Sequence, residues 1–119
     1  MSGILWAVLT STPAISPRFS EGSPHHVTLI FGGEKSQYQQ YLGREIEIYV
    51  TRECWNDRIQ ALSVVLPGDI PCQNSHPHIT VSFLPGVNPV ESNTMLEGVR
   101  QTRWLNFKLK AIIEWHEWK

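Results

Sequence analysis

Two short stretches of this chain repeat one pattern of polar and apolar residues. Residues 26–31 read HVTLIF and residues 78–83 read HITVSF, so the second copy begins 52 residues after the first. Each copy starts with His, places Thr two positions later and ends with Phe. β-Branched and aromatic residues bounded by turn formers are typical of strands. Because side chains alternate along a strand, we expect His and Thr on one face and the apolar residues on the other.

The residues repeated in the two copies are suited to phosphodiester chemistry. A neutral imidazole, on His26 or His78, can take a proton from water or from a ribose 2′-hydroxyl, while a protonated one gives a proton to the leaving oxygen. Imidazole has an ordinary pKa of about 6.5, so both forms exist near neutral pH. The hydroxyls of Thr28 and Thr80 can hold the phosphate oxygens, where negative charge accumulates. This scheme needs no metal and no cofactor, and the symmetry of the motifs leaves open which His is the base.

Two other interpretations of these histidines stay open. They can be ordinary half-buried strand residues, against which the matched strand context and the matched Phe argue. Alternatively, His76 and His78 form a His-x-His spacing that with His26 would supply three zinc ligands. Pro77 between the two histidines, and the lack of a carboxylate or thiol partner, weaken the zinc interpretation.

The doubled His-x-Thr pattern resembles the 2H phosphoesterases, which are named for two such motifs on a pseudo-two-fold sheet. The segment 86–96 (GVNPVESNTML) is similar to the one that follows the second motif in the cyclic phosphodiesterase domain of plant and fungal tRNA ligases. That branch includes phage proteins that cleave cyclic nucleotide signals. The resemblance rests on residues 25–33 and 76–98, and the gap between the motifs is compact for the family.

The resemblance implies a phosphodiesterase that acts on 2′,3′-cyclic phosphates or on 3′–5′ linkages with a free 2′-hydroxyl. The expected partner is a small nucleotide or an RNA end: either an RNA-repair substrate or a cyclic oligonucleotide messenger destroyed in evasion of anti-phage defence. Ring opening would leave a 2′-phosphate. A rival from another class is a non-catalytic nucleotide or RNA binder that uses the same cleft.

Composition limits these alternatives further. A chain of 119 residues is expected to form a single domain over residues 1–119. The net charge of −1 and pI near 6.5 argue against a protein that grips long duplex nucleic acid, which requires a basic face. No stretch approaches the roughly 20 apolar residues of a membrane helix, so we expect no membrane partner and a cytoplasmic protein. Cys54 and Cys72 match no metal or redox pattern, and free thiols are favoured over a disulfide. The oligomeric state stays open.

The expected elements are mainly strands with two short helices. Apolar or alternating runs predict strands over 3–10, 26–31, 45–51, 59–66, 78–83 and 104–118, and Trp115 and Trp118 are expected to anchor the last one. Tyr38, Tyr41 and Leu42 follow a helical spacing and predict a helix over 34–42; a second is expected over 94–99. Together with the internal repeat, this predicts an α+β fold: two pseudo-symmetric lobes of antiparallel sheet with a central cleft and short flanking helices.

Five further residues are candidates for substrate binding. Arg18 and Phe19 are the large side chains of the loop 11–24, which either closes over substrate as a lid or is a flexible surface loop. Trp55 is expected in a connection between strands, as a platform for a base or as part of a small hydrophobic cluster. Arg52 can pair with a phosphate or remain a solvated charge. Trp6 either faces the cleft or packs in the core.

Overall fold

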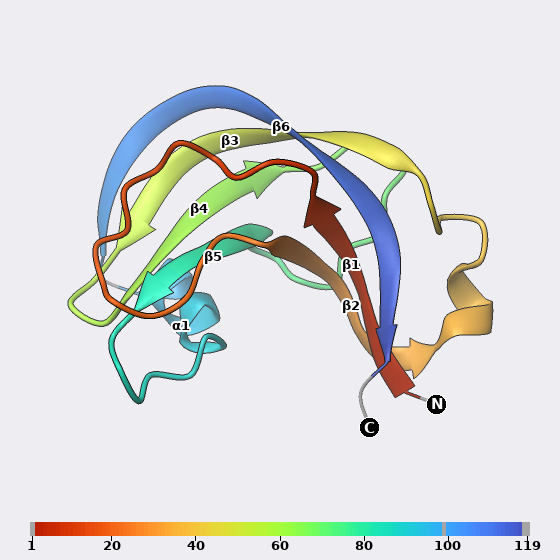
Figure 1. The fold of residues 1–119 in the computed structure, drawn as a ribbon, viewed down its shortest axis with the longest axis horizontal. Helices are drawn as coiled ribbons and strands as arrows, with labels where there is room; N and C mark the ends of the chain where they lie inside the picture. Colours follow the sequence, from red (N-terminus) through yellow and green to blue (C-terminus); the bar gives the residue numbers. More distant parts are fainter. Residues whose placement is uncertain (1, 99, 118–119) are drawn as a thin grey trace.

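The structure, a computed structural model, describes residues 2–98 and 100–117. In these residues the chain forms six strands, a 3-10 helix and an α-helix (Figure 1). Their bounds are β1 (Ser2–Leu9), β2 (His26–Glu34), η1 (Lys35–Tyr38), β3 (Glu45–Trp55), β4 (Ile59–Val65), β5 (His78–Phe83), α1 (Glu91–Glu97) and β6 (Gln101–Glu117). The strands close into an antiparallel barrel in the order β1-β2-β5-β4-β3-β6.

The expected α+β fold with two lobes and a central cleft is therefore wrong. The reason lies in β6, which is long enough to pair with two partners. Its first part pairs with β3, from Trp55↔Gln101 to Glu45↔Ile112, and its last part pairs with β1, down to Gly3↔Glu117. The two copies of the motif meet on the other side of the ring, where β2 pairs with β5. Both halves of the chain thus share one closed sheet.

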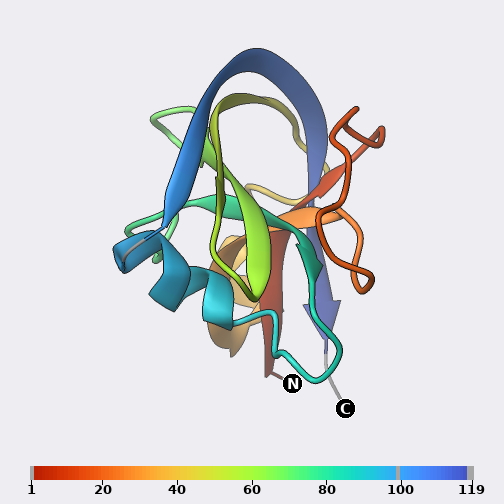
Figure 2. The same ribbon diagram turned by 90° about the vertical axis from the view of Figure 1, so that its left-hand side faces the viewer.

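Alternation along the strands fills the barrel with apolar side chains. Buried residues from every strand form the main core, among them Leu5, Val27, Ile48, Leu62 and Ile79, which have no exposed surface. A second cluster lies outside the barrel, where Met95 and Leu96 of α1 pack against Ile59 and Ala61 of β4. Figure 2 shows α1 beside β4. The short helix is thus held by the face of β4 that points away from the main core.

The helices differ from their predicted extents. The predicted helix over 34–42 is reduced to η1, which has Glu34 as N-cap and Gln37 closing a capping box. The residues before it, Gly32 and Gly33, belong to β2 and not to a turn. The helix expected over 94–99 begins earlier, at Glu91, and its last expected residue, Val99, lies outside the described residues.

The strands also run longer than the sequence pattern predicts. β3 continues through Arg52 to Trp55 with a register shift between Val50 and Arg52, so Trp55 lies in a strand and not in the connection. The two ends of the described chain lie side by side, because Gly3 pairs with Glu117 (Figure 1). Trp115 is half-buried and stacks on Tyr38, whereas Trp118 lies outside the described residues. No helix in the described ranges is both long enough and apolar enough to cross a membrane.

The connection between β1 and β2, residues 10–25, crosses in front of β3 and β4 in Figure 1, and we call it the strap. Backbone groups hold it to the barrel at both ends: Leu9 N–H donates to the His25 carbonyl, and Glu21 and Phe83 exchange two hydrogen bonds. Side chains of β3, β4 and β5 hold its middle, as described below. The expectation of a flexible surface loop does not fit these contacts.

Candidate active site

The four motif side chains lie on the outer face of the barrel where β2 meets β5. Their neighbours in sequence point inward: Val27 and Ile79 have no exposed surface and belong to the main core. The pairing of the two strands rests on the register Val27↔Ile79. The expected dry face of each motif is confirmed for these residues, whereas Phe31 of the first copy is 67% exposed.

This register crosses the two motifs. In an antiparallel pair centred on Val27↔Ile79, His26 stands opposite Thr80 and Thr28 stands opposite His78. The two histidines are then diagonal neighbours on one face, with Cα atoms about 7–8 Å apart. Each imidazole has the hydroxyl of the other motif beside it. A phosphate group placed on this face would therefore lie between two imidazoles and near two hydroxyls.

The ring of His78 is held by the backbone. Its Nδ1 lies 2.8 Å from the carbonyl oxygen of His76, and because a carbonyl only accepts, Nδ1 carries the proton. In neutral His78 the lone pair is consequently on Nε2. Burial lowers the pKa of His78 below its ordinary value, although the bond to the His76 carbonyl opposes this shift by stabilising the imidazolium. His78 is thus oriented as a proton acceptor.

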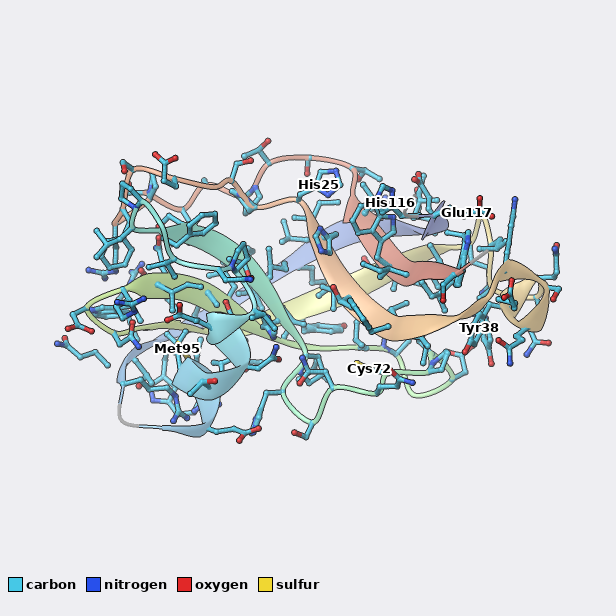
Figure 3. The ribbon with its side chains drawn as sticks, turned by 90° about the horizontal axis from the view of Figure 1, so that it is seen from below. His25, Tyr38, Cys72, Met95, His116 and Glu117 are labelled. Atoms are coloured by element: carbon cyan, nitrogen blue, oxygen red, sulfur yellow. The ribbon has the colours of Figure 1, made fainter. Side chains whose placement is uncertain are left out.

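His26 lies in a cluster of aromatic rings. Its ring centroid is 4.4 Å from that of Trp6. Trp6 also stacks on His116, with 4.5 Å between the two ring centroids. Nδ1 of His26 lies 3.1 Å from Nδ1 of His25, so one of the two nitrogens donates to the other. Burial and then the neighbouring imidazoles of His25, His78 and His116 lower the pKa of His26 to about 4. Figure 3 shows His25 and His116 on the same side of the molecule.

The contact between His25 and His26 differs from the expectation that adjacent strand residues point in opposite directions. β2 begins at His26, so His25 belongs to the strap and its side chain is not bound by the alternation of the strand. The HH dipeptide in the sequence was the available signal for this pair. His116 could not have been connected to the site from the sequence, because it arrives from β6 by the register Ile4↔His116.

The two threonines have different surroundings. Thr80 Oγ1 lies 2.9 Å from the hydroxyl of Ser92, a fully buried residue of α1, so the helix fixes the Thr80 side chain. The sequence does not predict this contact, because it joins two separate elements, β5 and α1. Thr28 Oγ1 makes no hydrogen bond to the described part of the protein. A pocket of about 130 Å³ lies beside Thr80, lined also by His25, His26 and Phe83 together with Gly22, Ser23 and Pro89.

The candidate substrate-binding residues do not gather in one place. Trp6 lies on the motif face opposite Thr28, half-buried against the imidazoles, and its indole N–H is buried without a partner in residues 2–98 and 100–117. Arg18 lies over the ring of Trp55, with its guanidinium carbon 3.5 Å from the ring centroid. One face of Trp55 is thereby covered. Arg52 pairs across the strands with Trp104, which is 78% exposed, on the outer wall formed by β3 and β6.

A buried carboxylate that the sequence did not single out anchors the strap. Glu53 is 1% exposed and faces inward, since its partner Leu62 lies in the main core. One of its oxygens accepts from Arg18 Nε at 2.6 Å and from Gln60 Nε2 at 2.8 Å. The other accepts from Nε and Nη2 of Arg103, at 3.0 and 2.8 Å. Both oxygens are therefore fully hydrogen-bonded.

Gln60 and Ser82 extend this network to the strap backbone. Arg18 N–H donates to both side chains, Phe19 N–H donates to the Ser82 hydroxyl, and Gln60 Nε2 donates to the carbonyl of Ser16. Phe19 thus meets the barrel through its backbone. The sequence does not distinguish Glu53, because strict alternation puts it on the same face as Glu45 and Glu47, which are exposed. The register shift between Val50 and Arg52 turns Glu53 inward, where the arginines meet it.

The zinc arrangement does not form in this structure. In the ranges 2–98 and 100–117, no three side chains of His, Cys, Asp or Glu gather closely enough to hold a metal ion. His76 contributes its carbonyl to the ring of His78, and its N–H donates to Asn74 Oδ1. Cys54 is buried, Cys72 is half-buried, and both are free thiols.

Comparison with known proteins identifies the family. No curated protein matches this chain. The family model described as the fungal tRNA ligase phosphodiesterase domain matches residues 26–114, a range that begins at the first motif histidine and includes the second motif. This confirms the resemblance to the tRNA-ligase branch of cyclic phosphodiesterases and supports a phosphodiesterase activity. Because the match covers well over half of the sequence, the chain belongs to the fungal tRNA ligase phosphodiesterase domain family.

Proposed function

We propose that this chain is a metal-independent phosphodiesterase that opens 2′,3′-cyclic phosphates, with two histidines as general base and general acid. The observation that carries the proposal is the crossed register of β2 and β5, which sets His26 and His78 diagonally on one face with a Thr hydroxyl beside each. In a phosphoryl transfer the attacking and leaving oxygens are roughly in line, so base and acid are needed on opposite sides of the phosphorus. Two diagonal imidazoles meet this need.

In this proposal His78 is the base. Its Nε2 lone pair takes a proton from water as the water oxygen bonds to phosphorus, and the His76 carbonyl stabilises the imidazolium that forms. His26, protonated, gives its proton to the departing 3′ oxygen as the P–O3′ bond breaks. The product is a 2′-phosphate with a free 3′-hydroxyl. Thr28 and Thr80 donate to the non-bridging oxygens.

The low pKa of His26 in the empty site is compatible with the acid role. A bound phosphodiester is an anion, and a negative charge nearby favours the imidazolium and raises its pKa. The bound substrate therefore raises the pKa of His26, the acid that gives a proton to the leaving oxygen. It follows that the alkaline limb of the kcat profile should lie at higher pH than that of kcat/KM, because kcat reports the complex and kcat/KM the free enzyme.

The substrates considered are RNA ends with a 2′,3′-cyclic phosphate and cyclic oligonucleotide messengers. An RNA end is favoured because the family to which this chain belongs is described as the fungal tRNA ligase phosphodiesterase domain. The first experiment is a turnover panel with chelator present, using 2′,3′-cyclic mononucleotides, RNA with a 2′,3′-cyclic phosphate end and several cyclic dinucleotides. The best substrate of the panel separates the two classes.

Substitutions test the roles of the two histidines. His26→Asn and His78→Asn should each lower kcat by about 10²–10⁴-fold on cyclic phosphates. A p-nitrophenyl phosphodiester has a leaving group that needs no proton, so on this substrate His26→Asn should recover most of its activity while His78→Asn stays inactive. If His26→Asn lost as much activity on the p-nitrophenyl substrate as on cyclic phosphates, the assignment of base and acid would be contradicted. A fully folded protein that binds nucleotides, with no turnover in the panel, would favour a binding module instead.

The threonines have a matched control on the exposed surface. Thr28→Val and Thr80→Val remove a hydroxyl near the phosphate, whereas Thr102→Val does so on the exposed part of β6. The first two should lower kcat/KM by roughly tenfold or more, as expected for one donor to a developing charge. The third should leave it unchanged, and a similar loss in all three would show that the effect is structural.

A further inference from the structure

Helix α1 lies beside the second motif and is fixed in place by β4 and its neighbours. Its apolar side chains pack on the face of β4 that points away from the main core, and Arg58 donates two hydrogen bonds to the carboxylate of Glu91, at 2.9 and 3.2 Å. Two polar side chains of its first turn, Ser92 and Asn93, make hydrogen bonds to segments of the chain outside the helix. The helix can therefore hold those segments in a fixed position.

A chain of hydrogen bonds runs from Asn93 to the ring of His78. Asn74 Nδ2 donates to Asn93 Oδ1 at 2.6 Å, and Asn74 Oδ1 accepts from the N–H of His76 at 2.9 Å. The carbonyl of His76 accepts from Nδ1 of His78 at 2.8 Å. At the other end, Asn93 Nδ2 donates to the Val90 carbonyl at 3.2 Å. Because a backbone N–H only donates and a carbonyl only accepts, each side-chain amide in this chain has one possible orientation.

The last bond of this chain decides which ring nitrogen of His78 can act as a base. A neutral imidazole has two tautomers, and the one present is set by the hydrogen bond that the other nitrogen makes. The His76 carbonyl selects the Nδ1–H tautomer and leaves the lone pair on Nε2. Pro77 favours an extended backbone at His76, while Asn74 holds the His76 N–H. The direction of the carbonyl is therefore fixed from both sides.

Ser92 fixes the other polar residue of the second motif. Its side chain is fully buried, so its hydroxyl proton needs an acceptor inside the protein. Among residues 2–98 and 100–117, the one hydrogen-bond partner of this hydroxyl is Thr80, at 2.9 Å. Ser92 is therefore the donor in this pair. Thr80 then keeps its own proton for an oxygen of the phosphate.

We propose that α1 is a positioning helix that fixes both polar side chains of the second motif. Asn93 acts through Asn74 and the backbone of His76, and sets the tautomer of the base. Ser92 sets the direction of the Thr80 hydroxyl. The inference rests on the proposed function for the role of each motif residue. Because a misplacement of about 1 Å can cost about a hundredfold in rate, breaking the chain should lower kcat far more than it weakens substrate binding.

Alanine variants test the chain of hydrogen bonds, with two matched controls. Asn74→Ala and Asn93→Ala should each lower kcat on 2′,3′-cyclic phosphates by about 10–100-fold, with KM changed by less than about threefold. Asn93→Asp keeps an oxygen that accepts from Asn74, so its kcat should stay within about threefold of the unmodified protein. Asn56→Ala also removes a side chain that accepts from backbone N–H groups, but in the turn between β3 and β4, and should leave kcat unchanged. An equal loss in Asn56→Ala, or no loss in Asn74→Ala, would overturn the positioning role.

NMR separates this inference from the proposed function, because the ¹⁵N chemical shifts of an imidazole report its tautomer without any turnover. The signals of His78 are those absent from His78→Asn. They should show the Nδ1–H tautomer in the unmodified protein and a mixture of both tautomers in Asn74→Ala. An unchanged tautomer in Asn74→Ala would overturn the inference and leave the proposed function intact. A mixture in a protein that cleaves no cyclic phosphate would support the inference and contradict the proposed function.

A double substitution tests whether Ser92 acts through Thr80. Thr80→Val should lower kcat/KM by roughly tenfold in the unmodified protein, as expected for one donor to a developing charge. In the Ser92→Ala background the same change should cost only about twofold, because the hydroxyl has already lost its orientation. A tenfold loss in both backgrounds would show that the two hydroxyls act independently and would overturn this part of the inference.

Discussion

The substitution Glu53→Gln tests whether a buried charge holds the strap in place. It keeps the shape of the side chain but removes its charge, and it places an amide N–H₂ among groups that only donate. One oxygen of Glu53 accepts from Arg18 and Gln60, and the other accepts twice from Arg103. The Gln side chain can satisfy at most one of these two sets.

The cost can be worked from the exposure of the partners. Removing one member of a buried ion pair costs about 3–5 kcal/mol when the other charge is left buried. Here the remaining charges, on Arg18 and Arg103, are 37% and 57% exposed and can be hydrated. Gln60 keeps its bond to the Ser16 carbonyl. We therefore expect a loss of about 2–3 kcal/mol, near the strength of the charge-assisted hydrogen bonds themselves, or roughly 8–15 °C in Tm for a domain of this size.

Thermal and urea unfolding at pH 7 measure this loss, and Glu47→Gln on the same strand is the control. Glu47 is exposed, so its substitution should stay within about 0.5 kcal/mol of the unmodified protein. The stabilisation from Glu53 is complete above its unfolded pKa near 4.5 and is lost as the pH falls through its lower folded pKa. The difference between Glu53→Gln and the unmodified protein should therefore shrink in acid. A loss below 0.5 kcal/mol at pH 7 would refute the charge-based anchoring.

Three further predictions concern single positions. Gly22 has φ +84° and a Cβ there would lie 2.6 Å from the ring of Phe83, whereas Gly43 has φ +83° with open space around it. Gly22→Ala should therefore lower kcat/KM by at least tenfold more than Gly43→Ala does. Both variants should lose about 1–2 kcal/mol of stability from backbone strain. The NMR titration of His26 in the free protein should have its midpoint near pH 4, and added phosphate should raise this midpoint. The free energy of unfolding should fall as the pH drops from 6.5 towards 4, because only the unfolded chain then binds the proton at this residue. A midpoint at pH 6.5 would contradict the burial of this ring. Burial raises the pKa of the Cys72 thiol, so iodoacetamide at pH 8 should label it at least tenfold more slowly than free cysteine, and labelling at the rate of the free thiol would show that the site opens.

Local signals allowed the motif face to be predicted but not the ring around it. The alternation in residues 26–29 and 78–81 correctly separates the wet and dry faces of both strands, because that information is contained in each strand. Closure of the barrel depends on β6 reaching both β1 and β3, a long-range pairing that no local pattern encodes. The same holds for individual residues. In the sequence, Glu53 resembles the exposed Glu45 and Glu47. What distinguishes it in the fold is its hydrogen bond from Arg103, which is 50 residues further along the chain.

The repeat in the sequence also suggested more symmetry than exists. Equivalent residues of the two motifs have different partners: Thr80 bonds to Ser92 of the helix, while Thr28 lies beside Trp6. The His78 ring is held by a backbone carbonyl, while that of His26 meets a second imidazole. These differences arise from segments outside the repeat, so the repeated residues could not reveal them. They are also what allows distinct roles to be proposed for the two histidines.

The junction of β2 and β5 has a consequence for the motions of the barrel. The opposite wall is paired from Glu45↔Ile112 to Trp55↔Gln101 with one register shift, between Val50 and Arg52, whereas the motif strands are joined at Val27↔Ile79. When the strand pairs of a barrel differ in the extent of their hydrogen bonding, local opening occurs first at the least paired strands. Amide protons around this junction should exchange with solvent sooner than those of β3 and β6, through openings that leave the rest of the ring intact. Because His26 and His78 stand on the two strands of this junction, such openings should also change the distance between the two imidazoles.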